Sequence, residues 1–554
     1  MNKPQSSNFL TYLDLFRIAS RYLAFETRRI QFIIFYTILV GILTVTASIL
    51  IQFVVNEIAF TGQSYPLIIL SGILVGTLLF NTTVQLIRKI LVELIQQRIL
   101  IRVTFAATDA LTRLPLGKEE TIRNHLVHRF FDVFSYQKSM TILLIDGVGT
   151  IIFSLVGSLI ILFYHPILFL LNLIIIAGLL TIIHYFLQPA LETNYQQSTA
   201  KYDLSQWLSE LADQRSFFWS TQLRNVSINL ADEKVSSYLM ARKNHFRIVV
   251  WQAGWLYLLQ AFGASLFLIF GGYLVLSGQM QLGQLVASES ILVALLYNIS
   301  QFSYTLDAGY DMVVASQKLD QLLDCYQNKE HRTYLHSSIK IKHPWQLKIG
   351  TYQNEKSIQI FHSGEIIFLE GFKQSDKHSF ILDILGQSEA KPNFRITLED
   401  IEISTISETW INENILFLDR PFRIGKELRK ELLMYQPENS REEFPRILAD
   451  IQRLWPETIL NSPTIENNAR LSLARLLFVP HKIIIIDQLL DFLSEQEMIF
   501  YLELAQKYLG EKIVICLSPS WFSWLQTINR YQNQITFNLN LNKIRELNYG
   551  YLEN

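Results

Sequence analysis

Long runs without a charged side chain occupy much of the first 300 residues. Four of these runs contain no Asp, Glu, Lys or Arg, and a fifth contains only Asp146; they are Phe32–Val55, Leu67–Ile87, Ile167–Leu187, Ile248–Ala287 and, with Asp146, Thr141–Tyr164. About 20 apolar residues allow a helix to cross the hydrocarbon core of a bilayer. The longest run divides near Gly278 and its second half continues towards Tyr304, so the sequence predicts six membrane-spanning helices.

The connections between the predicted spans differ in charge. Those after the second and fourth spans are long and rich in Lys and Arg, whereas Asn56–Pro66, His165–Pro166 and Ser277–Gln281 contain neither. Basic residues accumulate on the cytoplasmic side of membrane proteins. We therefore expect the two long connections and both termini to lie in the cytoplasm.

Composition narrows the classes of partner. Only 18% of the residues are charged, against about 25% in an average soluble domain, and the net charge is −1. Without a basic field, nucleic acid is disfavoured as a partner. Cys325 and Cys516 are the only cysteines, which excludes a disulfide framework and suits a reducing compartment.

The chain divides by character into four parts. We expect an amphipathic N-terminal segment over residues 1–30, a six-helix membrane domain over 31–326, a polar linker over 327–334 and a second domain over 335–554. Within the first part, residues 8–26 carry apolar groups at helical spacing. A helix lying on the inner membrane surface is the favoured interpretation, with a soluble coupling helix as the alternative.

The C-terminal part alternates short β-branched runs with helical patterns. These runs are Ile366–Leu369, Ile415–Leu418, Ile483–Ile486 and Ile513–Cys516. The alternation predicts an α/β domain with a mostly parallel sheet. Asp487 directly follows the third run. An acid at the C-terminal end of such a strand would face the ligand crevice of a parallel sheet. The alternative is that Asp487 has no catalytic role, because many strands end in Asp.

The segment Ala469–Gln488 resembles the part of ATP-binding cassette (ABC) proteins that joins the signature motif to the Walker B strand. Six spans with two long inner connections resemble the membrane domain of a type I ABC exporter. The motif L-S-G-Q-M-Q-L-G-Q-L-V-A resembles the branch that exports peptides and proteins with a membrane-fusion adaptor. The resemblance implies an all-α membrane domain followed by an α/β P-loop-type nucleotide-binding domain, in the bacterial inner membrane. The implied partners are lipid, a homodimeric or heterodimeric second half-transporter, and an adaptor.

The P-loop of that family corresponds to G-E-I-I-F-L-E-G-F-K-Q-S-D-K-H-S, with Gly371 and Lys377 at the expected positions. The second glycine is replaced by Asp376, and His378 stands at the magnesium-ligand position. Ser379, one place later, is a partial substitute for the lost hydroxyl. A carboxylate at about 4 Å from a phosphate costs about 4 kcal/mol at an effective dielectric near 20.

The other motif positions also depart from the residues that the family motifs contain. Asp487 matches the Walker B aspartate, but Gln488 replaces the glutamate that polarises water, and an amide cannot accept a proton. Residues 463–467 replace the glycine-containing signature, Ser518 replaces the switch histidine and Arg420 the Q-loop glutamine. The sequence thus predicts weak or absent binding of ATP and magnesium, at a residual site of Gly371, Lys377, Ser379 and Asp487, and no separate metal site.

Three functional hypotheses follow. The first is a transport component, for peptide or protein export, that has lost its ATP chemistry. The second is a non-transporting pseudo-ATPase that regulates or scaffolds an export system. The third, an active ATP-driven exporter with unorthodox sites, conflicts with the charge argument. Whether the chain is an enzyme stays open.

Two acids interrupt the apolar runs. Asp146 and Glu289 are candidates for a substrate pathway, because ionisable residues within a membrane are by default functional. The alternative is that either side chain lies in ordinary wet surroundings where a helix leaves the bilayer.

Overall fold

The computed structural model describes residues 20–58, 64–114, 126–323, 336, 344–352, 354–370, 374–388, 392–424, 432, 444–517 and 544–548. The chain forms two compact units, one within residues 1–328, without 115–117, and one that contains residues 329–554. Most of the predicted N-terminal amphipathic helix, the linker at 327–334, Gly371 and Ser518 lie outside the described residues.

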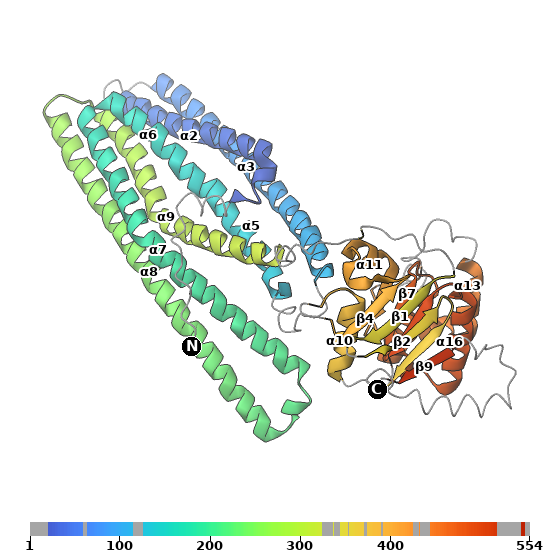
Figure 1. Ribbon diagram of the computed structural model, residues 1–554. Coiled ribbons are helices and arrows are strands. Elements are labelled where there is room, and N and C mark those ends of the chain that lie inside the picture. Colours follow the sequence, from blue (N-terminus) through green and yellow to red (C-terminus); the bar gives the residue numbers. More distant parts are fainter. Residues whose placement is uncertain are drawn as a thin grey trace. The chain divides into compact units, whose positions relative to one another are not determined.

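The first unit consists of long helices (Figure 1). They are η1 (Ala24–Glu26), α2 (Thr27–Asn56), α3 (Ser64–Thr112), α5 (Asp132–Ile142), η3 (Leu143–Gly147), α6 (Val148–Tyr164), α7 (Pro166–Asp213), η4 (Phe217–Trp219), α8 (Thr221–Leu276) and α9 (Leu282–Leu323). Within the described residues, six helical stretches are long and apolar enough to cross a bilayer, which confirms the predicted number. The third is continuous from Leu126 to Tyr164 through the π-helical turn η3.

Local chemistry explains where these helices stop. His165 is extended, its Nδ1 accepts from the backbone N–H of Ile167 at 3.2 Å, and Pro166 begins α7 with its φ already helical. Gly278 has a φ of +72°, a left-handed conformation that glycine adopts freely, in the turn between α8 and α9. These two turns lie at predicted short connections.

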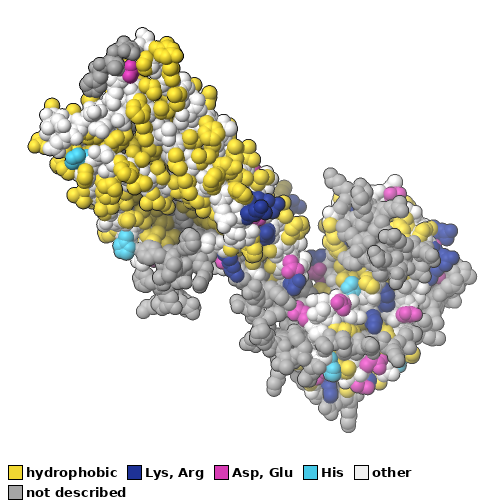
Figure 2. All heavy atoms as spheres, turned by 90° about the horizontal axis from the view of Figure 1, so that it is seen from above, with side chains coloured by type: hydrophobic (Ala, Val, Ile, Leu, Met, Phe, Trp, Pro, Cys, Tyr) yellow, Lys and Arg dark blue, Asp and Glu magenta, His cyan; other side chains and the backbone are white. Residues whose placement is uncertain are grey.

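Helix α9 lies at the centre of the helical unit. Its residues Ile291, Leu292, Leu295 and Ile299 are at most 1% exposed. By contrast, large apolar side chains elsewhere face outward, and Figure 2 shows hydrophobic side chains spread over much of the visible surface of this unit. Such an apolar exterior is unfavourable in water and suits contact with lipid.

The second unit is an α/β domain. Its strands are β1 (Gln346–Thr351), β2 (Asn354–His362), β3 (Ile366–Glu370), β4 (Phe394–Leu398), β5 (Ile401–Glu402), β6 (Ile415–Leu418), β7 (Ile483–Asp487), β8 (Ile513–Leu517) and β9 (Ile544–Asn548). Its helices are α10 (Gln374–Ile384), η6 (Ile403–Thr405), α11 (Glu408–Asn414), α13 (Phe444–Leu454), α14 (Glu457–Asn461), α15 (Ile465–Leu476), η8 (Leu489–Phe492) and α16 (Glu495–Tyr508).

The four predicted strands all belong to one sheet. The described strands of this five-stranded sheet follow the order β6-β7-β8-β3-β9, and every pairing is parallel. A four-stranded sheet of order β2-β1-β4-β5 is antiparallel, so the expectation of a mostly parallel sheet describes only one of the two layers. Every residue of β7 and β8 is buried, which is why these runs contain apolar side chains on both faces.

Candidate functional site

The carboxyl ends of the parallel strands bring two distant residues together. Asp487 is the last residue of β7, and Lys377 lies in α10, the helix that follows β3. The Lys377 Nζ is 2.6 Å from the Asp487 Oδ1, and each side chain is only 12% exposed. The structure therefore joins two of the four residues predicted for the residual ATP site in one buried ion pair.

Polar side chains in the first half of α10 form hydrogen bonds within the helix. The Ser379 hydroxyl donates to the Ser375 carbonyl at 3.1 Å, and the Ser375 hydroxyl donates to the Asp376 carboxylate at 3.2 Å. A carboxylate at a helix N-terminus complements the positive end of the helix dipole. In a P-loop this position favours phosphate, so Asp376 places a competing negative charge there.

Acidic groups dominate the surroundings of Asp487. Burial raises the pKa of Asp487, Lys377 acts in the opposite sense, and Asp419 and Asp491 raise the pKa further. Asp419 and Asp491 thus add to the negative charge of Asp487, and a polyphosphate would bring further negative charge to this site.

Gln488 follows Asp487 at the edge of the sheet. Its φ of +58° is left-handed, its side chain is exposed, and its backbone N–H donates to the Leu517 carbonyl at 3.1 Å. A neutral amide at this place can orient water by hydrogen bonds but cannot take its proton.

Residues 463–467 form the capped start of α15. The Thr464 hydroxyl accepts from the backbone N–H of Asn467 at 3.2 Å, and the Asn467 side chain accepts from Arg470 at 2.6 Å. Ile465 is 65% exposed, and Glu466 adds an acid to the first turn. The helix N-terminus therefore presents a bulky side chain and a carboxylate instead of bare amide groups.

Arg423, five residues after β6, binds residues on either side of this segment, and nothing in the sequence pattern indicated these contacts. Its Nε donates to the Asn468 side chain at 3.0 Å, and its Nη2 donates to the Leu460 carbonyl. Its Nη1 also donates to the Asn461 carbonyl at 3.4 Å. The guanidinium thus binds carbonyls that end α14 and a side chain of α15, and we call these contacts the Arg423 clamp.

Arg475 binds Phe422, the residue before Arg423. Arg475 is 1% exposed, its Nη1 donates to the Phe422 carbonyl at 3.0 Å, and its guanidinium lies 4.4 Å from the centre of the Phe422 ring. Burial and the neighbouring Arg423 lower its pKa to about 10. The two arginines are 52 positions apart, and no sequence motif links them, so the sequence did not indicate that they lie close together.

The donors and acceptors at this site do not suit magnesium and ATP. The Ser379 hydroxyl donates to a carbonyl within α10, and the Lys377 ammonium forms an ion pair with Asp487. Asp376 lies in the first turn of α10. Arg420, at the Q-loop position, lies 3.8 Å from Asp419. Magnesium prefers carboxylate, hydroxyl and phosphate oxygens, and here the Asp487 carboxylate contacts an ammonium while the Ser379 hydroxyl donates to a backbone carbonyl.

Asp146 lies at a different site, inside the helical unit. It lines a chamber of about 860 Å³ formed by α2, α3, η3, α6 and α9. Arg88 also lines this chamber and is only 8% exposed. Glu289, the other predicted pathway residue, is not among the lining residues, although its neighbour Ser290 is.

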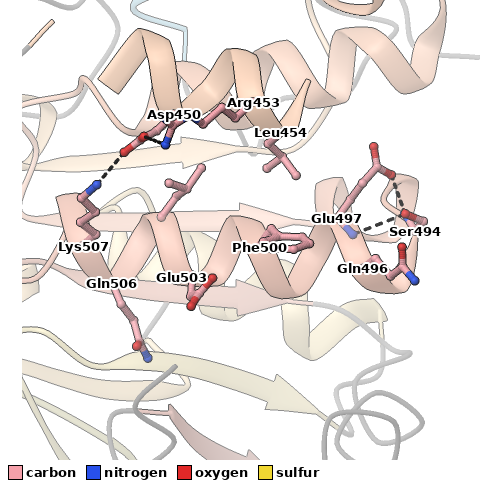
Figure 3. A pocket seen from close by; sticks show the side chains of 11 residues that line it. Asp450, Arg453, Leu454, Ser494, Gln496, Glu497, Phe500, Glu503, Gln506 and Lys507 are labelled. Atoms are coloured by element: carbon pink, nitrogen blue, oxygen red, sulfur yellow. Dashed lines mark hydrogen bonds and ion pairs between the residues drawn. The ribbon is translucent and has the colours of Figure 1, made fainter. Parts of the chain in front are cut away.

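A further hollow of about 810 Å³ lies in the α/β unit, between α13 and α16 (Figure 3). Several of its charged groups are paired: Asp450 binds Lys507 at 2.6 Å, and Glu497 binds Arg470 at 2.9 Å. Neither Lys377 nor Asp487 lines it. The hollow is therefore separate from the residual ATP site.

Comparisons with known proteins identify the architecture. No family model matches the sequence, and no curated protein matches it. The solved structure of a bacterial Atm1-family ABC exporter with ATP bound is similar to this chain, with a TM-score of 0.71 and 12% sequence identity, over 90% of this chain and 92% of that one. With its six apolar helices, the chain is an integral, multi-pass membrane protein that has the fold of a type I ABC exporter half-transporter.

Proposed function

We propose that this chain is a transport component of a peptide or protein export system whose α/β unit does not hydrolyse ATP. The observation that carries the proposal is the buried ion pair between Lys377 and Asp487, within an acidic site and beside Gln488. At the predicted motif positions, Asp376 and Glu466 add negative charge, and Gln488 removes a proton acceptor. The α/β unit thus retains the shape of an ATPase domain without its chemistry.

The proposed orientation places the α/β unit in the cytoplasm, because the basic connections flank the inner ends of the spans. The proposed assembly is a dimer, either of two copies or with another ABC half-transporter, because one set of six helices does not enclose a pathway. A membrane-fusion adaptor is the further partner that the motif near Gly278 favours.

Purified full-length chain in lipid nanodiscs tests the proposal. We expect no ATP hydrolysis above the background of a Lys377→Ala variant, and no saturable binding of a fluorescent ATP analogue with magnesium at micromolar concentration. Hydrolysis at transporter rates that disappears in Lys377→Ala would reject it in favour of an active exporter.

The transport role is tested separately, by deleting the gene and analysing exported peptides. Loss of a specific exported peptide supports a transport component. A change in the rate of another exporter, without loss of any flux that depends on this chain, would instead support the scaffolding hypothesis.

A further inference from the structure

The chamber in the helical unit contains a buried cation that is poorly satisfied. Arg88 is 8% exposed, its Nη1 donates to the Thr37 hydroxyl at 3.4 Å, and its buried Nε has no partner among the described residues. A guanidinium has five N–H donors. Since a buried charge without partners is costly, Arg88 is in place for a group that completes its hydrogen bonds.

Asp146 does not serve as that group. Both residues line the chamber and attract each other through space, but they form no ion pair within 4.0 Å, so Asp146 completes none of the hydrogen bonds of Arg88. Thr37 cannot neutralise the cation either, because it is uncharged and donates its own hydrogen to the Ile33 carbonyl at 2.7 Å. An external anion would both complete the hydrogen bonds of Arg88 and balance its charge.

The other residues that line the chamber indicate which further groups such a ligand contains. Gln85, Asn298 and Gln301 supply amides, which both donate and accept hydrogen bonds, and Tyr297 and Tyr304 supply exposed aromatic rings. A volume of about 860 Å³ lies within the range of small-molecule sites. Amides complement peptide groups, and a guanidinium pairs bidentately with a carboxylate.

Glycine keeps the approach to Arg88 open. A Cβ at Gly149 would lie 3.8 Å from the Arg88 Nη1, so a larger side chain here would extend into the space beside the guanidinium. Gly149 follows the π-helical turn that carries Asp146, and π-turns occur frequently at functional sites.

We propose that this chamber binds the carboxylate of a small peptide-like ligand through Arg88, with Asp146 opposing the anion and thereby limiting its affinity. The proposal rests on the proposed transport function and names the substrate class of the pathway. Arg88 anchors the carboxylate, the amides bind peptide groups, and the tyrosines hold an apolar side chain.

Two matched fluorescent probes test the charge assignment: dansyl-phenylalanine, which has a carboxylate, and dansyl-phenylalaninamide, which does not. We expect full-length chain in phosphatidylcholine nanodiscs to bind the acid about tenfold to a hundredfold more tightly than the amide, as charge-assisted pairing implies. Arg88→Gln abolishes this preference, Arg88→Lys retains part of it, and Asp146→Asn increases it. Lys138→Gln, which removes an exposed charge of α5 outside the chamber lining, leaves it unchanged.

A steric variant keeps the test decisive if Arg88→Gln does not fold. Gly149→Leu blocks the chamber without changing its charge and is expected to weaken both probes. Equal affinity for the two probes in the unaltered chain would overturn the proposal. Displacement of the acid by added phosphatidylglycerol would also overturn it, because the anion would then be a lipid headgroup.

The outcome is independent of the transport assay. If the probes show no carboxylate preference while gene deletion still abolishes an exported peptide, only the assignment of Arg88 fails. If Gly149→Leu prevents dimerisation but leaves probe binding unchanged, the chamber is a surface for the second copy and the proposal is wrong.

Discussion

The ammonium of Lys377 lies 2.6 Å from the carboxylate of Asp487, although 109 residues separate them in the chain. The contact exists because β3 and β7 end at the same edge of one parallel sheet. It pairs the ammonium that a triphosphate would otherwise attract. The pair thus acts as a structural element of the α/β unit.

Lys377→Met is expected to destabilise the α/β unit by about 3 kcal/mol, because it leaves a buried carboxylate without its cation. Thermal unfolding of the full-length chain, followed by tryptophan fluorescence, measures the effect. The double variant Lys377→Met/Asp487→Leu is expected to recover most of the loss, since neither charge remains. Unchanged stability of the single variant would show that the ion pair has no structural role.

Gln488→Glu is expected to leave ATP hydrolysis at background. The substitution restores a proton acceptor but adds a fourth carboxylate near Asp487, Asp419 and Asp491. Phosphate release from purified full-length chain checks this. A clear gain in rate from this single change would mean that ATP already binds productively and that the acidic site does not exclude it.

Arg423→Ala is expected to loosen the start of α15, because the clamp to the Leu460 carbonyl and the Asn468 side chain is lost. Hydrogen exchange of the backbone amides at 464–468 should accelerate about tenfold, which corresponds to about 1.4 kcal/mol. Arg446→Ala is the matched control, since Arg446 is exposed on α13 of the same unit. Equal exchange in both variants would contradict a clamp.

Lys512 is expected to make the stability of the α/β unit depend on alkaline pH. Its Nζ donates to the Val479 carbonyl, and burial lowers its pKa from 10.5 to about 8. Between these values the unfolded chain binds more protons than the folded one, so stability rises with pH. Relative to a Lys512→Met variant, the unaltered chain should gain up to about 3 kcal/mol from pH 8 to pH 10.5.

Denaturant titrations across this pH range check the Lys512 prediction. Lys507→Met provides a control of opposite sign, because the hydrogen bonds that Lys507 donates to Asp450 and Tyr508 raise its pKa. The stability from that pair is present at lower pH and is lost as pH rises through the folded-state pKa. A constant difference between the unaltered chain and Lys512→Met at every pH would contradict the buried position of Lys512.

Prediction from sequence succeeded where one local interaction dominates. A helix in lipid must satisfy its backbone internally, so apolar runs of sufficient length specified the six helical stretches. Likewise, runs such as Ile483–Ile486 specified buried strands, because both faces of a central parallel strand are covered. The antiparallel sheet was harder to foresee, since its strands β1, β2 and β4 mix polar and apolar residues.

The sequence by itself determined the helical stretches, the buried strands and the identities of the residues at the motif positions, because these depend on local hydrophobicity and spacing. Only the tertiary structure decided which charges meet: Lys377 with Asp487, Arg423 with the end of α14, and Arg88 in the same chamber as Asp146. Pairing of charges depends on distances between elements remote in sequence, and a charge pattern along one chain does not contain those distances.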